Sequence, residues 1–415
     1  MVHTSPLDQA GTGDAGGMNI YVCEAAKQMA ALGFKVDIFT RRANNDYPDI
    51  VDQGDGVRVI HLNVGPVHGV KKEDLPALIP DLSDAFKAAL TSGTQYDVIH
   101  SHYWISGKVA MPVAEELGIP LVHTMHTMAR VKNLNLAEGE IPEPMIRVQG
   151  ESQVVAAADA LIANTDAEAA SLVSLYEACP DNVSVVSPGV NLQTFTAGDG
   201  KFAARKRLGL PSGNIIAFVG RIQPHKGPEV LIRAIAEMIN HSPALQSDLT
   251  VMIIGGASGS NTVEVERLRE LAEWLGIAHI IRFEPPVSRN ELPDYYRAAD
   301  LVCVPSYSES FGLVALEAQA CGTPVVATAV GGLRTAVADG ISGALVDGHD
   351  PRAWSAVISR LISEPQRRLL LSMGAIEHAS HFGWENTARK TLDVYDWAIS
   401  QPAVDMRNIR LVKDA

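Results

Sequence analysis

The sequence lacks the features that mark metal-binding, redox, membrane and nucleic-acid-binding proteins. Only four of its 415 residues are cysteines, and none stands in a CxxC or other zinc-binding spacing. No apolar run reaches the roughly 18 residues that a membrane-spanning helix needs, and no signal peptide is recognisable, so a soluble cytoplasmic protein without membrane partners is expected. The formal net charge of −14 argues against sequence-independent nucleic-acid binding, which needs a basic face, but it allows a local cluster of cations around an anionic ligand.

The sequence does contain a regular alternation of apolar segments with helix-forming segments. Strands that alternate with helices predict parallel sheets, and a stretch at 188–200, rich in turn residues, interrupts the series as a linker. We therefore predict an α/β protein with two doubly wound, Rossmann-like domains facing a cleft: residues 1–190, joined by a C-terminal helix at 385–410, and residues 191–384. Cys303 lies in one apolar segment and is expected to be a buried small hydrophobe. The expected strands lie at 35–40, 57–64, 98–101, 121–126, 160–164, 183–186, 215–219, 249–254, 280–283, 301–304, 325–328 and 343–346.

A glycine-rich segment at 11–19 precedes a helix-forming segment at 20–32. Such a loop can bind phosphate, because its backbone N–H groups approach an anion closely. In folds of this kind the loop follows a strand, yet only two residues precede His3. The first strand of the N-terminal domain is therefore expected to be missing, with a true start about five to eight residues upstream. The alternative is that the segment is an N-terminal tail.

The stretch at 305–332 predicts a loop, a helix and a strand that follow the apolar segment 301–304. Its two carboxylates, Glu309 and Glu317, are eight positions apart, which is about 12 Å along a helix. That is too far for the acid and nucleophile of a retaining glycosidase, which are about 5 Å apart. The spacing suits a long ligand with hydroxyls at both ends and phosphate between them, such as a nucleotide sugar. Alternatively, Glu309 is a capping residue and Glu317 a surface residue.

Histidines cluster at two expected strand ends, His100 and His102 at one and His123 and His126 at the next. We do not expect a metal site, because no carboxylates accompany them and because His100 and His102 are expected on opposite faces of their strand. Contacts to a sugar or another hydroxyl ligand are favoured. His100 and His123 are alternatively polar strand ends satisfied by the backbone.

Two cations follow the strand at 215–219 on a loop bounded by glycines. Arg221 can bind a diphosphate with two hydrogen bonds, and Lys226 can add a point charge to the same group. This loop therefore predicts a diphosphate site.

Together, the segment 13–19, Gly220-Arg221 with Lys226, and Glu309-x7-Glu317 make the chain resemble the retaining glycosyltransferases of the GT-B fold, a large family that includes sucrose-phosphate synthases and bacterial mannosyltransferases. More narrowly, the segments 3–6, 11–19, 100–104, 123–127, 131–133 and 142–147 resemble the inositol 3-phosphate glycosyltransferases of mycothiol biosynthesis. That resemblance implies transfer of N-acetylglucosamine from UDP-N-acetylglucosamine to 1D-myo-inositol 3-phosphate, with retention of the α configuration.

The resemblance also implies roles for individual residues. Arg221 and Lys226 would hold the diphosphate, Glu317 the ribose, and Glu309 and His126 the donor sugar, which makes His126, Arg221, Lys226 and Glu309 the catalytic set. The other implied donor residues are Gln9, Ala10, Gly17 and, through its backbone at the uracil, Val287. The implied acceptor residues are His3, Asp14, Ala15, Gly16, Gly17, Met18, Asn19, Lys72, Tyr103, Thr127 and Arg147. A structural Mg²⁺ near Tyr296, Arg297, Ala299 and Thr323 is implied as well, together with a homodimer.

The expected chemistry needs no cofactor, because two cations can offset the charge of departing UDP without a general acid. One departure from the family pattern is Ala10, where related sequences often carry proline. Other functions remain open: a sucrose-phosphate synthase, a lipid mannosyltransferase, an epimerase, or a non-catalytic nucleotide-sugar-binding protein. A phosphorylase is disfavoured, because no motif for a pyridoxal-binding lysine is found.

Overall fold

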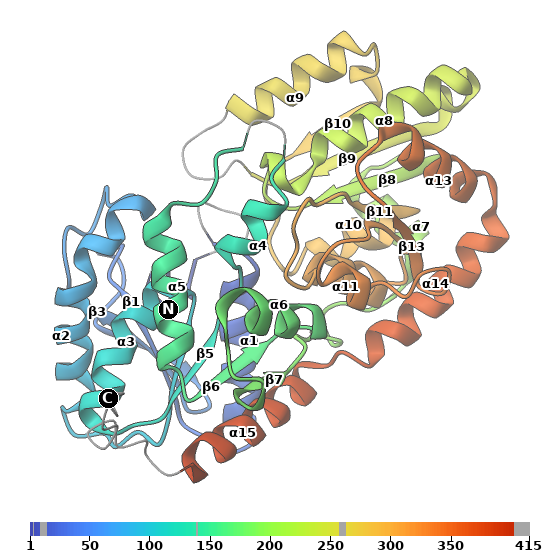
Figure 1. Cartoon of the computed structure of the whole chain (residues 1–415). Coiled ribbons are helices and arrows are strands. Elements are labelled where there is room, and N and C mark those ends of the chain that lie inside the picture. Colours follow the sequence, from blue (N-terminus) through green and yellow to red (C-terminus); the bar gives the residue numbers. More distant parts are fainter. Residues whose placement is uncertain (3, 9–14, 138–139, 257–262, 402–415) are drawn as a thin grey trace, which may run out of the picture.

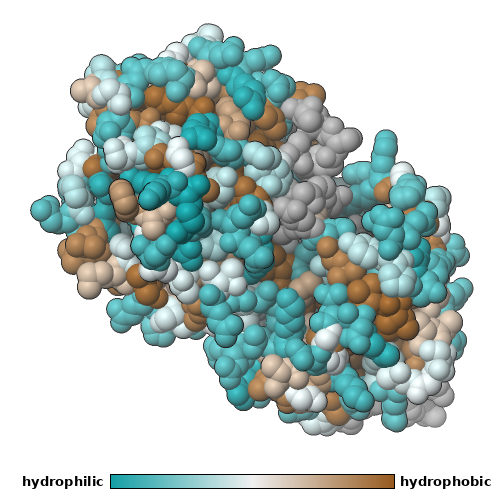
Figure 2. Space-filling view, turned by 180° about the vertical axis from the view of Figure 1, so that it is seen from behind, coloured by the Kyte–Doolittle hydropathy of each residue, from teal (hydrophilic) through white to brown (hydrophobic). Residues whose placement is uncertain are grey.

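The computed structural model describes residues 1–2, 4–8, 15–137, 140–256 and 263–401. These residues form two α/β regions, one from each half of the chain, as the alternation predicted (Figure 1). Seen from behind, the molecule has two lobes, and hydrophobic residues are scattered among hydrophilic ones over both (Figure 2). None of the helices in these ranges is both long and apolar enough to cross a membrane.

The second half forms a six-stranded parallel sheet with the strand order β10-β9-β8-β11-β12-β13. Its strands are β8 (Asn214–Val219), β9 (Leu249–Ile254), β10 (Ile281–Glu284), β11 (Leu301–Val304), β12 (Val325–Thr328) and β13 (Gly343–Val346). Its helices are α7 (Gly200–Leu208), α8 (Pro228–His241), α9 (Val263–Trp274), α10 (Leu292–Ala298), α11 (Leu313–Ala320), α12 (Leu333–Ala336), α13 (Pro351–Ser363) and α14 (Pro365–Ser380).

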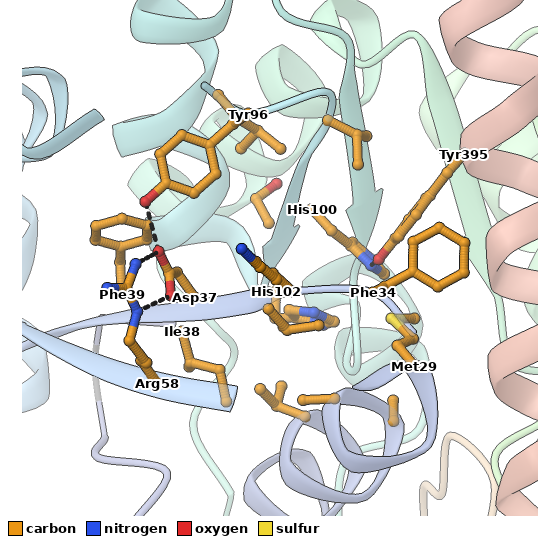
Figure 3. Close-up of a pocket in the computed structure, with 18 of the residues that line it drawn as sticks. Met29, Phe34, Asp37, Ile38, Phe39, Arg58, Tyr96, His100, His102 and Tyr395 are labelled. Atoms are coloured by element: carbon orange, nitrogen blue, oxygen red, sulfur yellow. Dashed lines mark hydrogen bonds and ion pairs between the residues drawn. The ribbon is translucent and has the colours of Figure 1, made fainter. Parts of the chain in front are cut away.

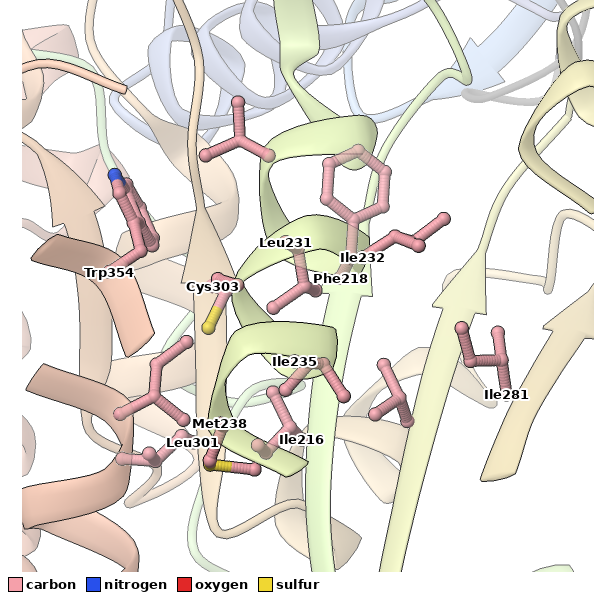
Figure 4. Close-up of a cluster of buried hydrophobic side chains, with 14 of the residues drawn as sticks. Ile216, Phe218, Leu231, Ile232, Ile235, Met238, Ile281, Leu301, Cys303 and Trp354 are labelled. Atoms are coloured by element: carbon pink, nitrogen blue, oxygen red, sulfur yellow. The ribbon is translucent and has the colours of Figure 1, made fainter. Parts of the chain in front are cut away.

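Hydrophobic clusters cover both faces of this sheet, which is why its strands read as continuous apolar runs. On one face, Leu231 and Ile235 of α8 lie over Ile216 of β8 (Figure 4). Cys303 of β11 is 1% exposed in the same cluster, which confirms that it is a buried hydrophobe.

The strand order reverses between β8 and β11, because β9 and β10 lie on one side and β12 and β13 on the other. In open α/β sheets, ligands bind at such a reversal, outside the carboxyl ends of the strands. The loops that leave β8 and β11 are 220–227 and 305–312, and these are the two loops that carry the predicted diphosphate residues and Glu309.

The first half contains two smaller sheets, with the orders β1-β3-β2 and β4-β5-β6-β7. The strands are β1 (Val36–Arg41), β2 (Ile50–Gly54), β3 (Val57–Leu62), β4 (Ile99–His102), β5 (Leu121–Thr124), β6 (Ala160–Ala163) and β7 (Val183–Val185). The helices are α1 (Gly17–Ala31), α2 (Ile79–Leu90), α3 (Trp104–Leu117), α4 (Ala129–Leu134), α5 (Met145–Ala157) and α6 (Asp166–Tyr176). Strand β2 was not predicted, and it runs antiparallel to β3. Its residues are mostly exposed and polar, so it has no apolar run.

The final helix, α15 (Trp384–Ser400), returns from the second region and runs along the first (Figure 1). Val190 N donates to Phe382 O at 2.7 Å, and Thr387 Oγ1 donates to Ser187 O at 2.8 Å. These two hydrogen bonds attach the start of α15 to the segment that links the two regions. Trp384 and Ala388 then pack in one cluster with α1. The part of the expected helix beyond residue 401 lies outside the described residues.

Candidate active site

The two loops at the strand-order reversal touch each other. A Cβ on Gly227 would stand 2.0 Å from the carbonyl oxygen of Pro305, and Gly227 has a φ of +68°, so glycine is required at this contact. The approach brings Lys226 and Glu309 together, with Nζ to Oε2 at 2.6 Å. Both side chains keep partial exposure, 23% and 18%. The structure thus forms one ion pair from two residues that are 83 positions apart.

Arg221 faces the first α/β region. A Cβ on Gly16 would lie 3.7 Å from Nε of Arg221, and a Cβ on Gly17 would lie 3.5 Å from Leu313. Gly17 is the first residue of α1, and the first N–H groups of a helix attract anions. An arginine and a helix N-terminus therefore converge from opposite sides of the cleft.

Asn19 organises the described part of the glycine-rich segment. Its Oδ1 accepts from Gly16 N at 3.0 Å, and its Nδ2 donates to Ser5 O at 2.6 Å. Ala15 and Asn19 are buried, whereas Met18 is half-buried. Of the predicted site residues, His3, Gln9, Ala10 and Asp14 lie outside the described residues.

Glu317 lies inside α11 and is 4% exposed, so it is not a surface residue. Its Oε2 accepts from the Tyr296 hydroxyl at 2.9 Å, and its Oε1 lies 3.5 Å from Nη1 of Arg289. Burial raises the pKa of Glu317, and Arg289 acts against that rise. The carboxylate is thus oriented by a hydroxyl on one oxygen and a cation on the other.

The histidine expectation was wrong in one respect. His100 and His102 do not point to opposite faces of β4, because residues i and i+2 of a strand share a face. Their ring centroids are 4.1 Å apart. His100 binds Tyr395 OH at 2.6 Å and Thr124 Oγ1 at 2.8 Å, and His123 binds Ser101 Oγ at 2.7 Å. Both ring nitrogens of His100, which Figure 3 shows beside Tyr395, therefore have hydroxyl partners from neighbouring elements, whereas His123 has a hydroxyl partner on Nδ1 and its buried Nε2 has none among the described residues.

His126 follows β5 and borders the cleft. Its Nε2 lies 2.9 Å from Nδ1 of His102, so one ring donates to the other. Tyr21 packs edge-on against His126 at 5.0 Å, and Ser310 Oγ donates to the His126 carbonyl from the second region. The residue as a whole is half-buried, and burial of the ring lowers its pKa to about 3. His126 is consequently neutral at physiological pH.

Tyr103 is the centre of a second cluster, at the end of β4. Lys72 Nζ and the guanidinium of Arg147 each lie 5.1 Å from the centroid of its ring. Arg147 Nη2 also donates to Thr127 Oγ1 at 2.7 Å. The four residues expected from distant parts of the sequence to form an acceptor site are thus brought together, and Lys72 is half-buried there instead of lying in a fully exposed charge run.

Arg147 is more deeply engaged than the sequence indicated. It is 4% exposed, with Nη1 at 2.8 Å from Glu143 and Nε at 2.7 Å from Glu151. Glu143 pairs with Lys132 as well. The acidic neighbours raise the pKa of Arg147 despite its burial, so it is always a cation. Most of the N–H donors of Arg147 already have protein acceptors, so the side chain is held in place beside Tyr103.

Two family models match the chain in tandem. "Glycosyl transferase 4-like domain" matches residues 16–189, and "Glycosyl transferases group 1" matches residues 201–378. A D-inositol 3-phosphate glycosyltransferase of Thermobispora bispora is 55% identical over 403 residues, which cover 96% of this chain and 94% of the relative. One of Streptosporangium roseum is 53% identical over 402 residues, with 96% and 92% covered. The chain belongs to the D-inositol 3-phosphate glycosyltransferase family.

Comparison with solved structures identifies the fold. A sucrose-phosphate synthase of Thermosynechococcus elongatus has a TM-score of 0.87 at 31% identity, covering 96% of this chain and 97% of that one. Anabaena HepE, solved with UDP-glucose, has a TM-score of 0.75 at 20% identity, covering 94% and 98%. The expected GT-B fold is confirmed, and this member of the glycosyltransferase family is a hexosyltransferase.

The residues implied for Mg²⁺ in this family offer a poor cation site. The Tyr296 carbonyl accepts from Thr323 Oγ1 at 2.6 Å and from Ala299 N at 3.1 Å. The Arg297 guanidinium is bound to Thr196 O at 2.7 Å and to Asp294 at 2.8 Å. Among the residues that the structure describes, no three His, Cys, Asp or Glu side chains are grouped as metal ligands. Mg²⁺ prefers six oxygen donors in an octahedron, and these side chains and the Tyr296 carbonyl, already engaged with one another and with Thr196 and Asp294, do not fit that arrangement.

Two residues that contact the predicted site residues were not predicted. Arg289 lies beside Glu317, and Ser310 crosses the cleft to His126. Of these two, only Ser310 lies in a loop that the sequence singled out. His102, which the histidine pattern did single out, binds the His126 ring. Val287, predicted through its backbone, is half-buried beside the second region's core.

Proposed function

We propose that this enzyme moves N-acetylglucosamine from UDP-N-acetylglucosamine to 1D-myo-inositol 3-phosphate with retention of configuration, the first committed step of mycothiol biosynthesis. The names of the full-length relatives support this acceptor. The observation that carries the proposal is the cluster of Lys72, Arg147, Tyr103 and Thr127, in which two cations lie beside the ring of Tyr103 and one of them binds the hydroxyl of Thr127. Such a set suits a phosphate monoester on a polyol.

On the donor side, Arg221 and Lys226 bind the diphosphate of UDP together with the N-terminus of α1. Glu317, oriented by Tyr296 and Arg289, accepts hydrogen bonds from the ribose. Glu309 accepts from the donor sugar while its other oxygen stays on Lys226. The backbone at Val287 contacts uracil.

The chemical step follows from charge. As the bond to the anomeric carbon breaks, negative charge grows on the diphosphate, and Arg221 and Lys226 stabilise it without a proton donor. His126 is neutral and therefore contributes a hydrogen bond to the donor sugar, not a proton. The acceptor hydroxyl attacks from the face that UDP leaves, and a diphosphate oxygen takes its proton.

We assign acceptor binding to residues 1–190 with the C-terminal helix, and donor binding to residues 191–384. Both substrates are charged, water-soluble metabolites, which supports a cytoplasmic enzyme. We retain a homodimer as the proposed assembly, and light scattering of the purified protein at several concentrations measures it.

Transfer to a sugar phosphate, as in a sucrose-phosphate synthase, is the second candidate. The 31% identity and TM-score of 0.87 to such an enzyme favour it. Both acceptors carry a phosphate monoester that suits the cluster of Lys72, Arg147, Tyr103 and Thr127. The two candidate functions therefore differ in the part of the acceptor to which the phosphate is attached.

The deciding experiment measures UDP release from UDP-N-acetylglucosamine and UDP-glucose with three acceptors: inositol 3-phosphate, inositol and fructose 6-phosphate. We expect fast release only with UDP-N-acetylglucosamine and inositol 3-phosphate together. A preference for fructose 6-phosphate would contradict the proposed acceptor. Equal rates with inositol and inositol 3-phosphate would contradict the proposal that the cluster binds the phosphate of the acceptor.

A further inference from the structure

One segment of the first region reaches across the cleft to the loop that carries Lys226. It comprises residues 140–144, which directly precede α5, and we call it the cleft segment. At its start, Oε1 of Glu140 lies 3.3 Å from Nδ1 of His225. His225 is the residue before Lys226 in the short 3-10 helix η3 (Pro224–Lys226). The contact therefore joins the first region to the chain neighbour of a predicted catalytic cation.

The other end of the cleft segment is attached to the acceptor cluster. Oε2 of Glu143 lies 2.8 Å from Nη1 of Arg147, and Oε1 of Glu143 pairs with Lys132. The backbone N–H of Glu143 donates to Oδ1 of Asn133 at 2.7 Å. Arg147 in turn lies over the Tyr103 ring. The position of the cleft segment is therefore set in part by Arg147, one of the residues that we assign to the acceptor phosphate.

The carboxylate of Glu140 is held in place on its own side of the cleft. Its Oε2 accepts from Ala137 N at 3.1 Å, and its backbone N–H donates to Ala137 O at 3.1 Å. These bonds leave Oε1 for His225. The side chains of His225 and Glu140 are 19% and 18% exposed, so their contact is largely shielded from water.

At neutral pH the contact is a hydrogen bond to a carboxylate and not an ion pair. Burial lowers the pKa of His225, and the cations Lys226 and Lys132 lower it further, against the opposing effect of Glu140. The pKa of Glu140 is also lowered, chiefly by its contact with His225. A neutral imidazole with its proton on Nδ1 therefore donates to a charged acceptor, and such hydrogen bonds are stronger than those between neutral groups.

His225 is held from the second region as well. Its carbonyl accepts from Tyr307 N at 2.8 Å, in the loop that carries Glu309. Because η3 spans only three residues, a shift of His225 also shifts Lys226. That shift would move Lys226 Nζ away from Glu309 Oε2, from which it is now 2.6 Å distant.

We propose that Glu140 and His225 are positioning residues for the transfer reaction: Glu140 holds His225 from across the cleft, and His225 thereby places Lys226 on the diphosphate. The proposal rests on the proposed function, in which Lys226 binds the diphosphate and the Tyr103 cluster binds the acceptor. Neither Glu140 nor His225 is assigned a contact with substrate. Small displacements of a group that stabilises the transition state can nevertheless lower the rate strongly.

The test compares variants in a steady-state assay with UDP-N-acetylglucosamine and inositol 3-phosphate. Glu140→Leu and His225→Leu each remove the contact. We expect each to lower kcat by about ten-fold, the lower end for a hydrogen bond to a charged group, because the contact is partly exposed. Both KM values should change less than about three-fold. The double variant should lose no more than either single variant, because the two residues act through one contact.

Two further variants separate positioning from a general effect on the fold. His225→Asn keeps an N–H donor near the place of Nδ1 and should retain most of the activity. Glu237→Leu is the matched control, because Glu237 lies 3.9 Å from His241 in a carboxylate–imidazole pair within α8, and its kcat should equal that of the unsubstituted protein. The thermal midpoint of every variant is measured, so that loss of folded protein is not taken for loss of turnover.

Several results would overturn the proposal. Additive losses in the double variant would show that Glu140 and His225 act independently. A His225→Asn variant as slow as His225→Leu would show that the donor at Nδ1 is not what matters. A rise in the KM for inositol 3-phosphate alone would make Glu140 an acceptor ligand instead of a positioning residue.

Failure of the proposed function is recognised separately. If the unsubstituted protein releases no UDP with inositol 3-phosphate, the proposed acceptor is wrong. The variants are then compared by the slow hydrolysis of UDP-N-acetylglucosamine and UDP-glucose in water, which requires charge stabilisation on the diphosphate but no acceptor. The same loss of about ten-fold is expected for Glu140→Leu and His225→Leu. Equal hydrolysis by all forms would overturn the positioning role.

Discussion

Replacing Lys72 with methionine tests the acceptor cluster most directly. Lys72 Nζ lies 5.1 Å from the Tyr103 ring centroid, and methionine keeps the apolar stem while removing the charge. A hydrogen bond to a charged group contributes about 1.5–3 kcal/mol, which corresponds to roughly 10- to 150-fold in affinity. We expect the KM for inositol 3-phosphate to rise by that factor, with the KM for UDP-N-acetylglucosamine unchanged. Steady-state kinetics with each substrate varied in turn measures both.

Lys71 supplies a matched control, since it is adjacent and exposed. Lys71→Met should leave both KM values within about two-fold, because exposed charges are screened. Arg147→Ala is a poorer probe, because it leaves the carboxylates of Glu143 and Glu151 without the cation that they share. Breaking a buried ion pair in this way costs about 3–5 kcal/mol of stability. Equal effects of Lys71→Met and Lys72→Met would refute the assignment, and so would a donor KM that rises with the acceptor KM.

Substitutions at three further residues test the donor side and one buried histidine. Lys226→Ala should lower kcat by about 10²- to 10³-fold in a steady-state assay, because it removes charge stabilisation in the transition state, while Lys226→Arg should retain more activity. Glu317→Gln should act mainly on the donor, with about ten-fold weaker UDP binding by calorimetry and kcat nearly unchanged; the reverse pattern would contradict the ribose role. Burial holds the pKa of His123 at about 3, below its ordinary 6.5. As the pH falls, the unfolded chain therefore protonates His123 at a higher pH than the folded chain does. The stability from neutral His123 is therefore complete above pH 6.5 and falls by up to about 1.4 kcal/mol per pH unit as pH drops toward 3. We would measure the free energy of unfolding with urea between pH 7 and 5. For His123→Gln it should depend on pH less steeply than for the unsubstituted protein, by an amount that corresponds to about one proton.

Local patterns in the sequence predicted all six strands of the second region. Each predicted strand there is an apolar run bounded by glycine, proline or polar residues, and β8 and β11 lie within a residue or so of their predicted positions. Once a parallel sheet is inferred, the loops after these strands must meet at one edge. That reasoning requires no knowledge of side-chain contacts, and it places the loops that carry Lys226 and Glu309 at the same edge of the sheet.

Side-chain partners could not be predicted in the same way. The contacts of Arg147 with Glu143 and Glu151 are four residues apart in each direction, from the residue before the cap of α5 to the middle of the helix, yet nothing local shows that this side of the helix is buried. The partners of Glu317 are Arg289 and Tyr296, from elsewhere in the chain. Strand β2 is mostly exposed, so it lacked the apolar signal that revealed the other strands.

The backbone at the candidate site carries a further feature that local preference opposes. Tyr103 and His126 have φ values of +71° and +58°, which non-glycine residues rarely adopt, and they stand at the ends of the neighbouring strands β4 and β5. Such conformations persist where surrounding contacts over-determine them. Here Lys72 and Arg147 pack on the Tyr103 ring, and His102 and Ser310 bind His126, so segments from both halves of the chain fix the strain. The residues around Tyr103 and the ring of His126 are thus positioned by tertiary contacts that only the folded chain supplies.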